Sequence, residues 1–442
     1  MSEFGLPYWL DIERPVFPRL EQDISADVAI IGAGLCGLKV AYYLAQQGVR
    51  SVILEGAQVG SGASGRNQGS INHGGSPTYA KTIERHSRPT AKALWQLGLE
   101  NHRLLRQQIE QLDIACDYQR DGFVFLARRD LPSGEEALQA YQNDCRLLDE
   151  DGFESILLDK REASALGGSD RYLGGFIYDS DAQFHAGKYV VGLGQGVSSM
   201  PNVSLFEDTR VTHIERIGNV TKLKTPNATV TAPTVFLGTN ALVPQFVPHL
   251  ERGLRAERGQ VFVTAPLDKR PCRGSFGTDM AWWREIIESD GRFRLLFGGG
   301  RARDEANSLF PQFDANGDPH PLLESAGFSH SAEHQARLDE QFALLFPQLT
   351  GVPITHRWGG LQSFVADSFP QVGLFDAERS IYGIAGLCGR GNCYSDVAAA
   401  YLAGKIAGVE HSVEQRFGTL FESILAVNRP TAGWGEWQGV NQ

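Results

Sequence analysis

Near the start of the chain, a strand, a glycine-rich turn and a helix follow one another, and this order constrains the fold most strongly. The apolar, mainly β-branched run 27–31 predicts a strand buried on both faces. The turn at 32–37 is a complete G-x-G-x-x-G, and a helical pattern follows over 38–47. A second apolar strand, 51–54, ends in Glu55. The sequence therefore predicts a Rossmann-like unit.

The spacing of this unit gives each glycine a separate task. Gly32 permits a tight turn, Gly34 lets a diphosphate approach the backbone, and Gly37 lets the helix pack closely on the strand. The N-terminus of the helix then faces the diphosphate. Glu55, 18 residues after Gly37, can accept hydrogen bonds from ribose hydroxyl groups. The motif leaves open whether the dinucleotide is FAD or NAD. The predicted contacts are Gly32, Gly34, Leu35, Cys36, Gly37 and Glu55.

Glycine is over-represented in the whole chain, at 50 of the 442 residues, where an average protein has about 7%. The glycines gather at 32–37, 60–75, 298–300 and 383–391. Such clusters indicate places where the backbone approaches a ligand or another segment closely.

The rest of the composition disfavours several classes of protein. A formal net charge of −11 argues against a nucleic-acid partner, because phosphate binding needs a basic surface. No apolar run reaches the ~18 residues of a transmembrane helix, and residues 1–5 lack a signal-peptide pattern. Six cysteines without a C-x-x-C pair disfavour disulfides and zinc, so no metal site is predicted. We therefore expect a cytoplasmic protein without a membrane span.

The second glycine cluster distinguishes between the two dinucleotides. Taken alone, 59–70 is either a flexible surface loop or a binding segment, and Arg66 and Asn67 within it favour binding. Its Gly-Ala-Ser-Gly-Arg-Asn-x-Gly pattern resembles the D-amino-acid oxidase-like superfamily of FAD-dependent amine and amino-acid oxidoreductases, in which such a segment lies beside the flavin. The resemblance implies FAD contacts at Ser64, Arg66, Asn67, Gln68 and Gly69.

Further blocks extend the resemblance over nearly the whole chain. They are 175–181, 209–214, 235–241 and 381–391, in the order that the family has. The stretch 8–11 and the second glycine cluster look most like the γ-glutamylputrescine oxidase branch, near the glycine and sarcosine oxidases. The further cofactor contacts that the resemblance implies are Val211, Thr239, Asn240, Gly389, Arg390, Gly391 and Asn392.

The substrate side is less clearly marked. The family builds its pocket around the stretch that here contains Trp282, Trp283 and Arg284. Paired tryptophans can hold an amine by cation–π contact or simply belong to the core. Arg284 either binds a substrate carboxylate or lies on the domain surface. His73 either reaches the site or is bonded to the backbone.

Two further positions depart from the family pattern. Gln362 stands where the α-amino-acid oxidases of the family often have an arginine that grips the substrate carboxylate. This difference puts plain amino acids in doubt as substrates. Arg390 stands where the family often has histidine, and it either turns towards the flavin or faces solvent. The candidate catalytic residues are His73, Trp282, Arg284, Gln362 and Arg390.

The resemblance implies an FAD-dependent oxidase of a primary or secondary amine, such as a γ-glutamyl amine, a polyamine or an N-alkyl amino compound. Hydride passes to flavin N5, water hydrolyses the imine, and O2 reoxidises the flavin to give H2O2. In related branches of the family, FAD is attached through a cysteine in the segment that corresponds to 358–370 or through a histidine near the second glycine cluster. Here 358–370 contains no cysteine, and His73 is displaced from the position of that histidine. The resemblance therefore implies non-covalent FAD. The alternatives are a dehydrogenase with a quinone or carrier acceptor, a non-catalytic flavin-binding partner protein, and an NAD-dependent dehydrogenase.

The predicted fold class is α/β, with a Rossmann-like FAD-binding domain interleaved with an α+β substrate domain built on an antiparallel sheet. We expect the FAD-binding domain to comprise 1–94, 153–240 and 352–442. The substrate domain then comprises 95–152 and 241–351.

Overall fold

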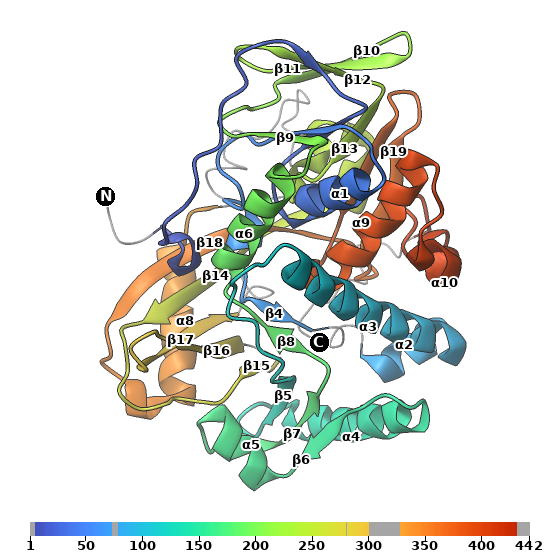
Figure 1. Ribbon diagram of the computed structural model, residues 1–442. Coiled ribbons are helices and arrows are strands. Elements are labelled where there is room, and N and C mark those ends of the chain that lie inside the picture. Colours follow the sequence, from blue (N-terminus) through green and yellow to red (C-terminus); the bar gives the residue numbers. More distant parts are fainter. Residues whose placement is uncertain (1–4, 73–77, 280, 300–327, 431–442) are drawn as a thin grey trace.

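The computed structural model describes residues 5–72, 78–279, 281–299 and 328–430, and their strands form four sheets (Figure 1). A six-stranded sheet lies in the upper half of Figure 1 and an eight-stranded sheet in the lower half. A four-stranded sheet covers the upper end. Its strands are β1 (Ile24–Ser25), β10 (His213–Ile217), β11 (Val220–Lys224) and β12 (Thr229–Ala232).

The six-stranded sheet has the order β19-β20-β13-β2-β3-β9, and all its pairs are parallel except that between β19 and β20. Its strands β2 and β3 bury every residue, as the apolar runs in the sequence predict. The strands are β2 (Val28–Ile31), β3 (Ser51–Leu54), β9 (Val203–Phe206), β13 (Thr234–Leu237), β19 (Gln371–Asp376) and β20 (Ile381–Ala385).

The two faces of β2 pack against different layers. Val28 and Ile30 belong to the core that the sheet shares with helices α1 (Leu35–Gln46), α6 (Ala186–Ser198) and α9 (Gly391–Ala407). Ala29 and Ile31 face the opposite way and pack with residues of the four-stranded sheet. Helix α1 begins three residues earlier than the helical pattern suggests, because the last part of the glycine motif forms its first turn.

The second large sheet has the order β18-β14-β17-β16-β15-β5-β7-β6, with one parallel pair, β5 with β15, among antiparallel ones. The predicted combination of a Rossmann-like sheet with a mainly antiparallel sheet is confirmed. The strands are β5 (Phe123–Arg128), β6 (Ile156–Leu158), β7 (Tyr172–Tyr178), β14 (Arg255–Thr264), β15 (Ser275–Gly277), β16 (Ala281–Ile287), β17 (Phe293–Gly299) and β18 (Ile354–Phe364).

The remaining elements cover or connect these sheets. The two-stranded sheet of β4 (Ser70–Ile71) and β8 (Ala182–Gln183) lies between the two large ones (Figure 1). None of the helices in the described ranges carries an apolar stretch long enough to cross a bilayer. The other helices are α2 (Tyr79–Arg85), α3 (Arg88–Gln111), α4 (Gly134–Glu150), α5 (Lys160–Gly167), α8 (Ala332–Leu345) and α10 (Ser412–Phe421).

Sheet membership differs from the expected division by residue number at three places. Strands β6 and β7, expected with the FAD-binding domain, pair in the eight-stranded sheet, and so does β18, which pairs with β14 from Arg255↔Phe364 onwards. Most of α3 falls in the range expected for the substrate domain, yet it packs on α9. An apolar strand pattern marks burial but does not specify a distant pairing partner, so the sequence alone could not indicate that β6, β7 and β18 join the eight-stranded sheet.

A buried ion pair joins helices α1 and α9, which pack against each other. Lys39 of α1 donates to the carboxylate of Asp396 of α9, and both side chains are fully buried. Lys39 Nζ also donates to Ser395 Oγ at 2.8 Å. Asn101 of α3 accepts from the backbone N–H of Asp396 at 3.0 Å. A buried pair with such partners holds α1 and α9 in one relative position.

We predict that Lys39→Met destabilises the protein, because it leaves the Asp396 carboxylate buried without its cation. The free energy of unfolding should fall by about 3–5 kcal/mol, as for other broken buried pairs. The double variant Lys39→Met/Asp396→Leu removes both charges and should regain most of that loss. Urea unfolding of the four apoproteins measures this, and purely additive effects of the two single substitutions would contradict it.

Candidate functional site

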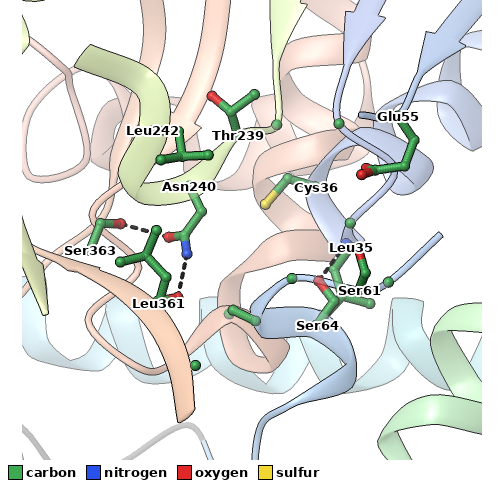
Figure 2. A pocket seen from close by; sticks show the side chains of 18 of the residues that line it. Leu35, Cys36, Glu55, Ser61, Ser64, Thr239, Asn240, Leu242, Leu361 and Ser363 are labelled. Atoms are coloured by element: carbon green, nitrogen blue, oxygen red, sulfur yellow. Dashed lines mark hydrogen bonds between the residues drawn. The ribbon is translucent and has the colours of Figure 1, made fainter. Parts of the chain in front are cut away.

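A cavity lies where the carboxyl ends of β2, β3 and β13 meet the second glycine cluster, the end of β18 and the start of α9 (Figure 2). Fifteen of the residues that the sequence singles out line it. They are Gly32, Gly34, Leu35, Cys36, Glu55, Ser64, Arg66, Asn67, Val211, Thr239, Asn240, Gln362, Gly389, Gly391 and Asn392.

The glycine turn brings the backbone of α1 against the strand ends. Gly32 has a φ of +98°, as its tight turn requires. A Cβ atom on Gly37 would lie 2.0 Å from the carbonyl oxygen of Gly32, so a side chain does not fit there. Gly34 caps α1 without a side-chain hydrogen bond, and a Cβ atom on it would lie 3.0 Å from Ser64 Oγ. The positive end of the helix dipole therefore faces the cavity with little covering it.

Ser64 and Glu55 lie on either side of this helix end (Figure 2). The N–H of Leu35 donates to Ser64 Oγ at 3.0 Å. The Glu55 carboxylate accepts from the N–H groups of Ala33 and Ala57 at 2.8 and 2.9 Å. Burial raises the pKa of Glu55, although these two amides act in the opposite direction. A carboxylate held in this way keeps lone pairs for a hydroxyl donor in the cavity.

A second polar group lines the cavity opposite Leu35 (Figure 2). Asn240 Nδ2 donates to the carbonyl of Leu361, and Ser363 Oγ donates to Asn240 Oδ1, both at 2.8 Å. Thr239 Oγ1 and Asn392 Oδ1 are buried and find no hydrogen-bond partner among the described residues. Orphaned polar atoms at a cavity wall fit a ligand with its own donors and acceptors, as a dinucleotide has.

The second glycine cluster wraps one side of the cavity and is tightly bonded. Arg66 Nε donates to the carbonyl of Ser61 at 2.7 Å, and its Nη1 donates to that of Gly359 at 3.0 Å. Its guanidinium lies 4.9 Å from the ring centre of Phe328. Burial lowers the pKa of Arg66 to about 10. The Asn67 side chain connects this cluster to α9, because Asn392 Nδ2 donates to its Oδ1 at 3.3 Å.

Three of the cofactor residues that the sequence indicates do not line the cavity but pack against segments that do. Gly37 packs on the strand turn, as described above. Gln68 Nε2 donates to the carbonyl of Trp283 at 3.1 Å. Gly69 has a φ of +79°, and a Cβ atom there would lie 2.7 Å from Arg284 Nη1.

The candidate catalytic residues are dispersed. Gln362 lines the cavity. Trp282 lies over Gly298, where a Cβ atom would be 2.5 Å from its ring, whereas Trp283 on the other face of β16 is fully buried in the core of the eight-stranded sheet. His73 lies outside the described residues.

Arg284 and Arg390 are both buried. The alternatives that Arg284 lies on the domain surface and that Arg390 faces solvent are therefore wrong. Arg284 Nη1 donates to the carbonyl of Phe184 at 2.8 Å. Arg390 Nη2 donates to the carbonyl of Ser368, and its guanidinium lies 5.2 Å from the ring centre of Tyr394. Each of these two buried cations donates to backbone carbonyl groups, which are acceptors that a guanidinium can use in place of a carboxylate.

Other lining residues were not indicated by any motif. Arg210 and Ser363 are close in sequence to indicated residues, so their segments were identified but not their roles. The apolar side chains after Asn240 follow no recognisable pattern, because η3 (Asn240–Gln245) is a short 3-10 helix interrupted by Pro244. The further lining residues include Ser61, Leu242, Gln245, Phe246, Phe328, Leu361 and Leu387.

Comparisons with known proteins agree with this geometry. The chain is 27% identical over 401 residues to the gamma-glutamylputrescine oxidoreductase of Escherichia coli, covering 88% of this chain and 84% of that protein. It is also 27% identical over 400 residues to the probable oxidoreductase OrdL of Haemophilus influenzae, covering 89% and 85%. Among solved structures, glycine oxidase from Geobacillus kaustophilus superposes with a TM-score of 0.73 at 20% identity, over 92% of this chain and 100% of that one.

The family model described as "DAO: FAD dependent oxidoreductase" matches residues 27–405, which include the glycine turn, the second glycine cluster and most of α9. This match spans the cavity and both large sheets. The chain therefore belongs to the DAO family of FAD-dependent oxidoreductases.

Proposed function

We propose that the cavity holds FAD in an extended form and that the protein uses it to oxidise a primary or secondary amine, with O2 as the electron acceptor. The observation that carries this proposal is the continuity of the cavity. It runs from the N-terminus of α1 and Glu55, past Asn67, to Gln362 and the start of α9. Such a path suits a dinucleotide with its diphosphate at one helix end and its ring system at another.

The adenosine half of FAD is assigned to the strand ends of the six-stranded sheet. The N–H groups at the start of α1 face the diphosphate, and Glu55 accepts hydrogen bonds from the ribose. Val211, which also lines the cavity, lies beside the adenine in this arrangement. The non-covalent character of FAD stays a prediction here, supported by the absence of cysteine from 358–370.

The flavin half is assigned to the space between the second glycine cluster and α9. When bound, FAD would accept the two electrons of the substrate carbon–hydrogen bond that is broken. The start of α9, with Gly389, Gly391 and Asn392, directs the positive end of a helix dipole at the cavity. That field stabilises negative charge developing there during reduction. Asn67 and Asn392 hold the two walls together through their mutual hydrogen bond.

The proposed substrate class follows from Gln362. This neutral amide lines the cavity at a position where, by resemblance, α-amino-acid oxidases have an arginine. Arg66, a cation that also lines the cavity, already donates from Nε and Nη1 to backbone carbonyls. A carboxylate next to the reacting carbon thus lacks an obvious bidentate partner. The gamma-glutamylputrescine oxidoreductase of Escherichia coli acts, as its name says, on an amine of this kind, at 27% identity.

We predict that anaerobic mixing with γ-glutamyl amines, polyamines or N-methyl amines bleaches the flavin absorption band, because one of these classes passes its electrons to FAD. Stopped-flow absorbance measures the rate for each class. Bleaching by α-amino acids alone would contradict the argument from Gln362, and no bleaching by any amine would indicate a non-catalytic flavoprotein. In air, H2O2 release distinguishes an oxidase from a dehydrogenase, which turns over only with an artificial dye acceptor.

We also predict that Gly37→Ala weakens FAD binding by about tenfold or more, because the new methyl group pushes α1 away from the turn at Gly32. Overpacking of this kind costs about 1–3 kcal/mol. Isothermal titration of the apoprotein with FAD measures the effect. The control is Gly418→Ala on α10, where the Cβ atom meets only Glu414 Cγ at 3.7 Å. Equal FAD affinity in the two variants would show that this contact does not position the cofactor.

A further inference from the structure

Four consecutive carbonyl groups in the second glycine cluster, those of residues 66–69, each accept a hydrogen bond from a buried side chain. The donors are the indole of Trp9 in η1 (Tyr8–Leu10), the indole of Trp358 in β18 and the guanidinium of Arg284 in β16. These three elements are far apart in the sequence, although β16 and β18 belong to the same eight-stranded sheet. The same short segment lines the proposed flavin site through Arg66 and Asn67.

The geometry of these contacts is specific. Trp9 Nε1 lies 2.7 Å from the oxygen of Asn67, and Trp358 Nε1 lies 3.0 Å from that of Arg66. Arg284 Nη1 lies 3.3 and 3.4 Å from the oxygens of Gln68 and Gly69. Gly69 allows this approach because it has no side chain.

Holding the carbonyls fixes the direction of the amides as well. In a planar trans peptide, the N–H points away from the C=O of the same unit. The carbonyls of Arg66 and Asn67 share their peptide units with the N–H groups of Asn67 and Gln68. Neither of these N–H groups donates to any part of the chain that the structure describes. The side that faces away from the two indoles therefore presents two donors that remain available.

The three donors also depend on one another. The Arg284 guanidinium lies 5.3 Å from the ring centre of Trp9, so the cation and the indole stack as they bind neighbouring carbonyls. Arg284 is only 6% exposed, and it donates to backbone carbonyls rather than to a carboxylate. Glu285, beside it in sequence, is instead paired with Arg270. A buried cation needs those carbonyl dipoles, so it holds them in place.

We propose that Trp9, Trp358 and Arg284 are positioning residues that clamp the carbonyls of 66–69 and thereby keep the Asn67 and Gln68 amides available to the flavin. This inference rests on the proposed placement of FAD in the cavity. It gives a task to Trp9, which the cofactor motif does not explain. It also assigns Arg284 to the flavin side of the protein rather than to a substrate carboxylate.

The test compares Trp9→Phe with Trp283→Phe. Both remove an indole N–H from a nearly or fully buried side chain, but the Trp283 Nε1 has no hydrogen-bond partner among the described residues. FAD affinity of the apoprotein is measured by fluorescence titration, and the bound flavin by its absorption maxima and midpoint potential. We expect Trp9→Phe to weaken FAD binding about 3- to 10-fold, the effect of one lost hydrogen bond, and to shift the flavin bands and potential.

Trp283→Phe should lower the melting temperature of the apoprotein while leaving FAD affinity, bands and potential near those of the wild type. The inference is overturned if the two variants lose thermal stability equally and neither changes the flavin. It is also overturned if both change the flavin to the same extent. Where Trp9→Phe does not fold, Trp358→Phe takes its place in the same comparison. A wild-type protein that binds no FAD contradicts the proposed function itself, which distinguishes the two failures.

Discussion

The close contact of backbone with backbone at the start of α1 is the constraint on which the rest of the site depends. A Cβ atom on Gly37 would lie 2.0 Å from the Gly32 carbonyl, and one on Gly238 would lie 2.9 Å from the Gly37 nitrogen. Glycine at these positions lets the helix sit directly on the ends of β2 and β13. The helix end, Glu55 and Thr239 therefore meet around one cavity, and no side chain fills the space that a diphosphate needs.

Two helices direct their N-termini at this cavity, and the fold holds them together from behind. The Lys39–Asp396 pair joins α1 to α9, and both of its side chains are fully buried. On the cavity side, Asn67 and Asn392 join the second glycine cluster to α9. The site thus has fixed walls made of helix dipoles and backbone groups, with few titratable side chains. That composition suits a protein whose cofactor carries out the redox step while the chain binds, orients and excludes water.

The local parts of this site could be predicted from the sequence, and the distant contacts could not. Gly32, Gly37 and Glu55 lie within one βαβ unit, so their spacing alone defines their geometry. Arg284 binds carbonyls 215 and 216 positions away, and no spacing rule indicates such a partner. For the same reason, β7 and β18 look like ordinary apolar strands until their pairing in the eight-stranded sheet is known. Likewise, nothing in the sequence around Arg390 indicates its hydrogen bond to the Ser368 carbonyl.

The central claim is that this cavity binds FAD with its two halves at opposite ends. A crystal structure of the FAD-bound protein tests it most directly. We expect density for the ribose next to Glu55, for the diphosphate at the N–H groups of Leu35 and its neighbours, and for the flavin between residues 66–69 and the start of α9. Density for FAD elsewhere, or in the reverse orientation, would contradict this placement.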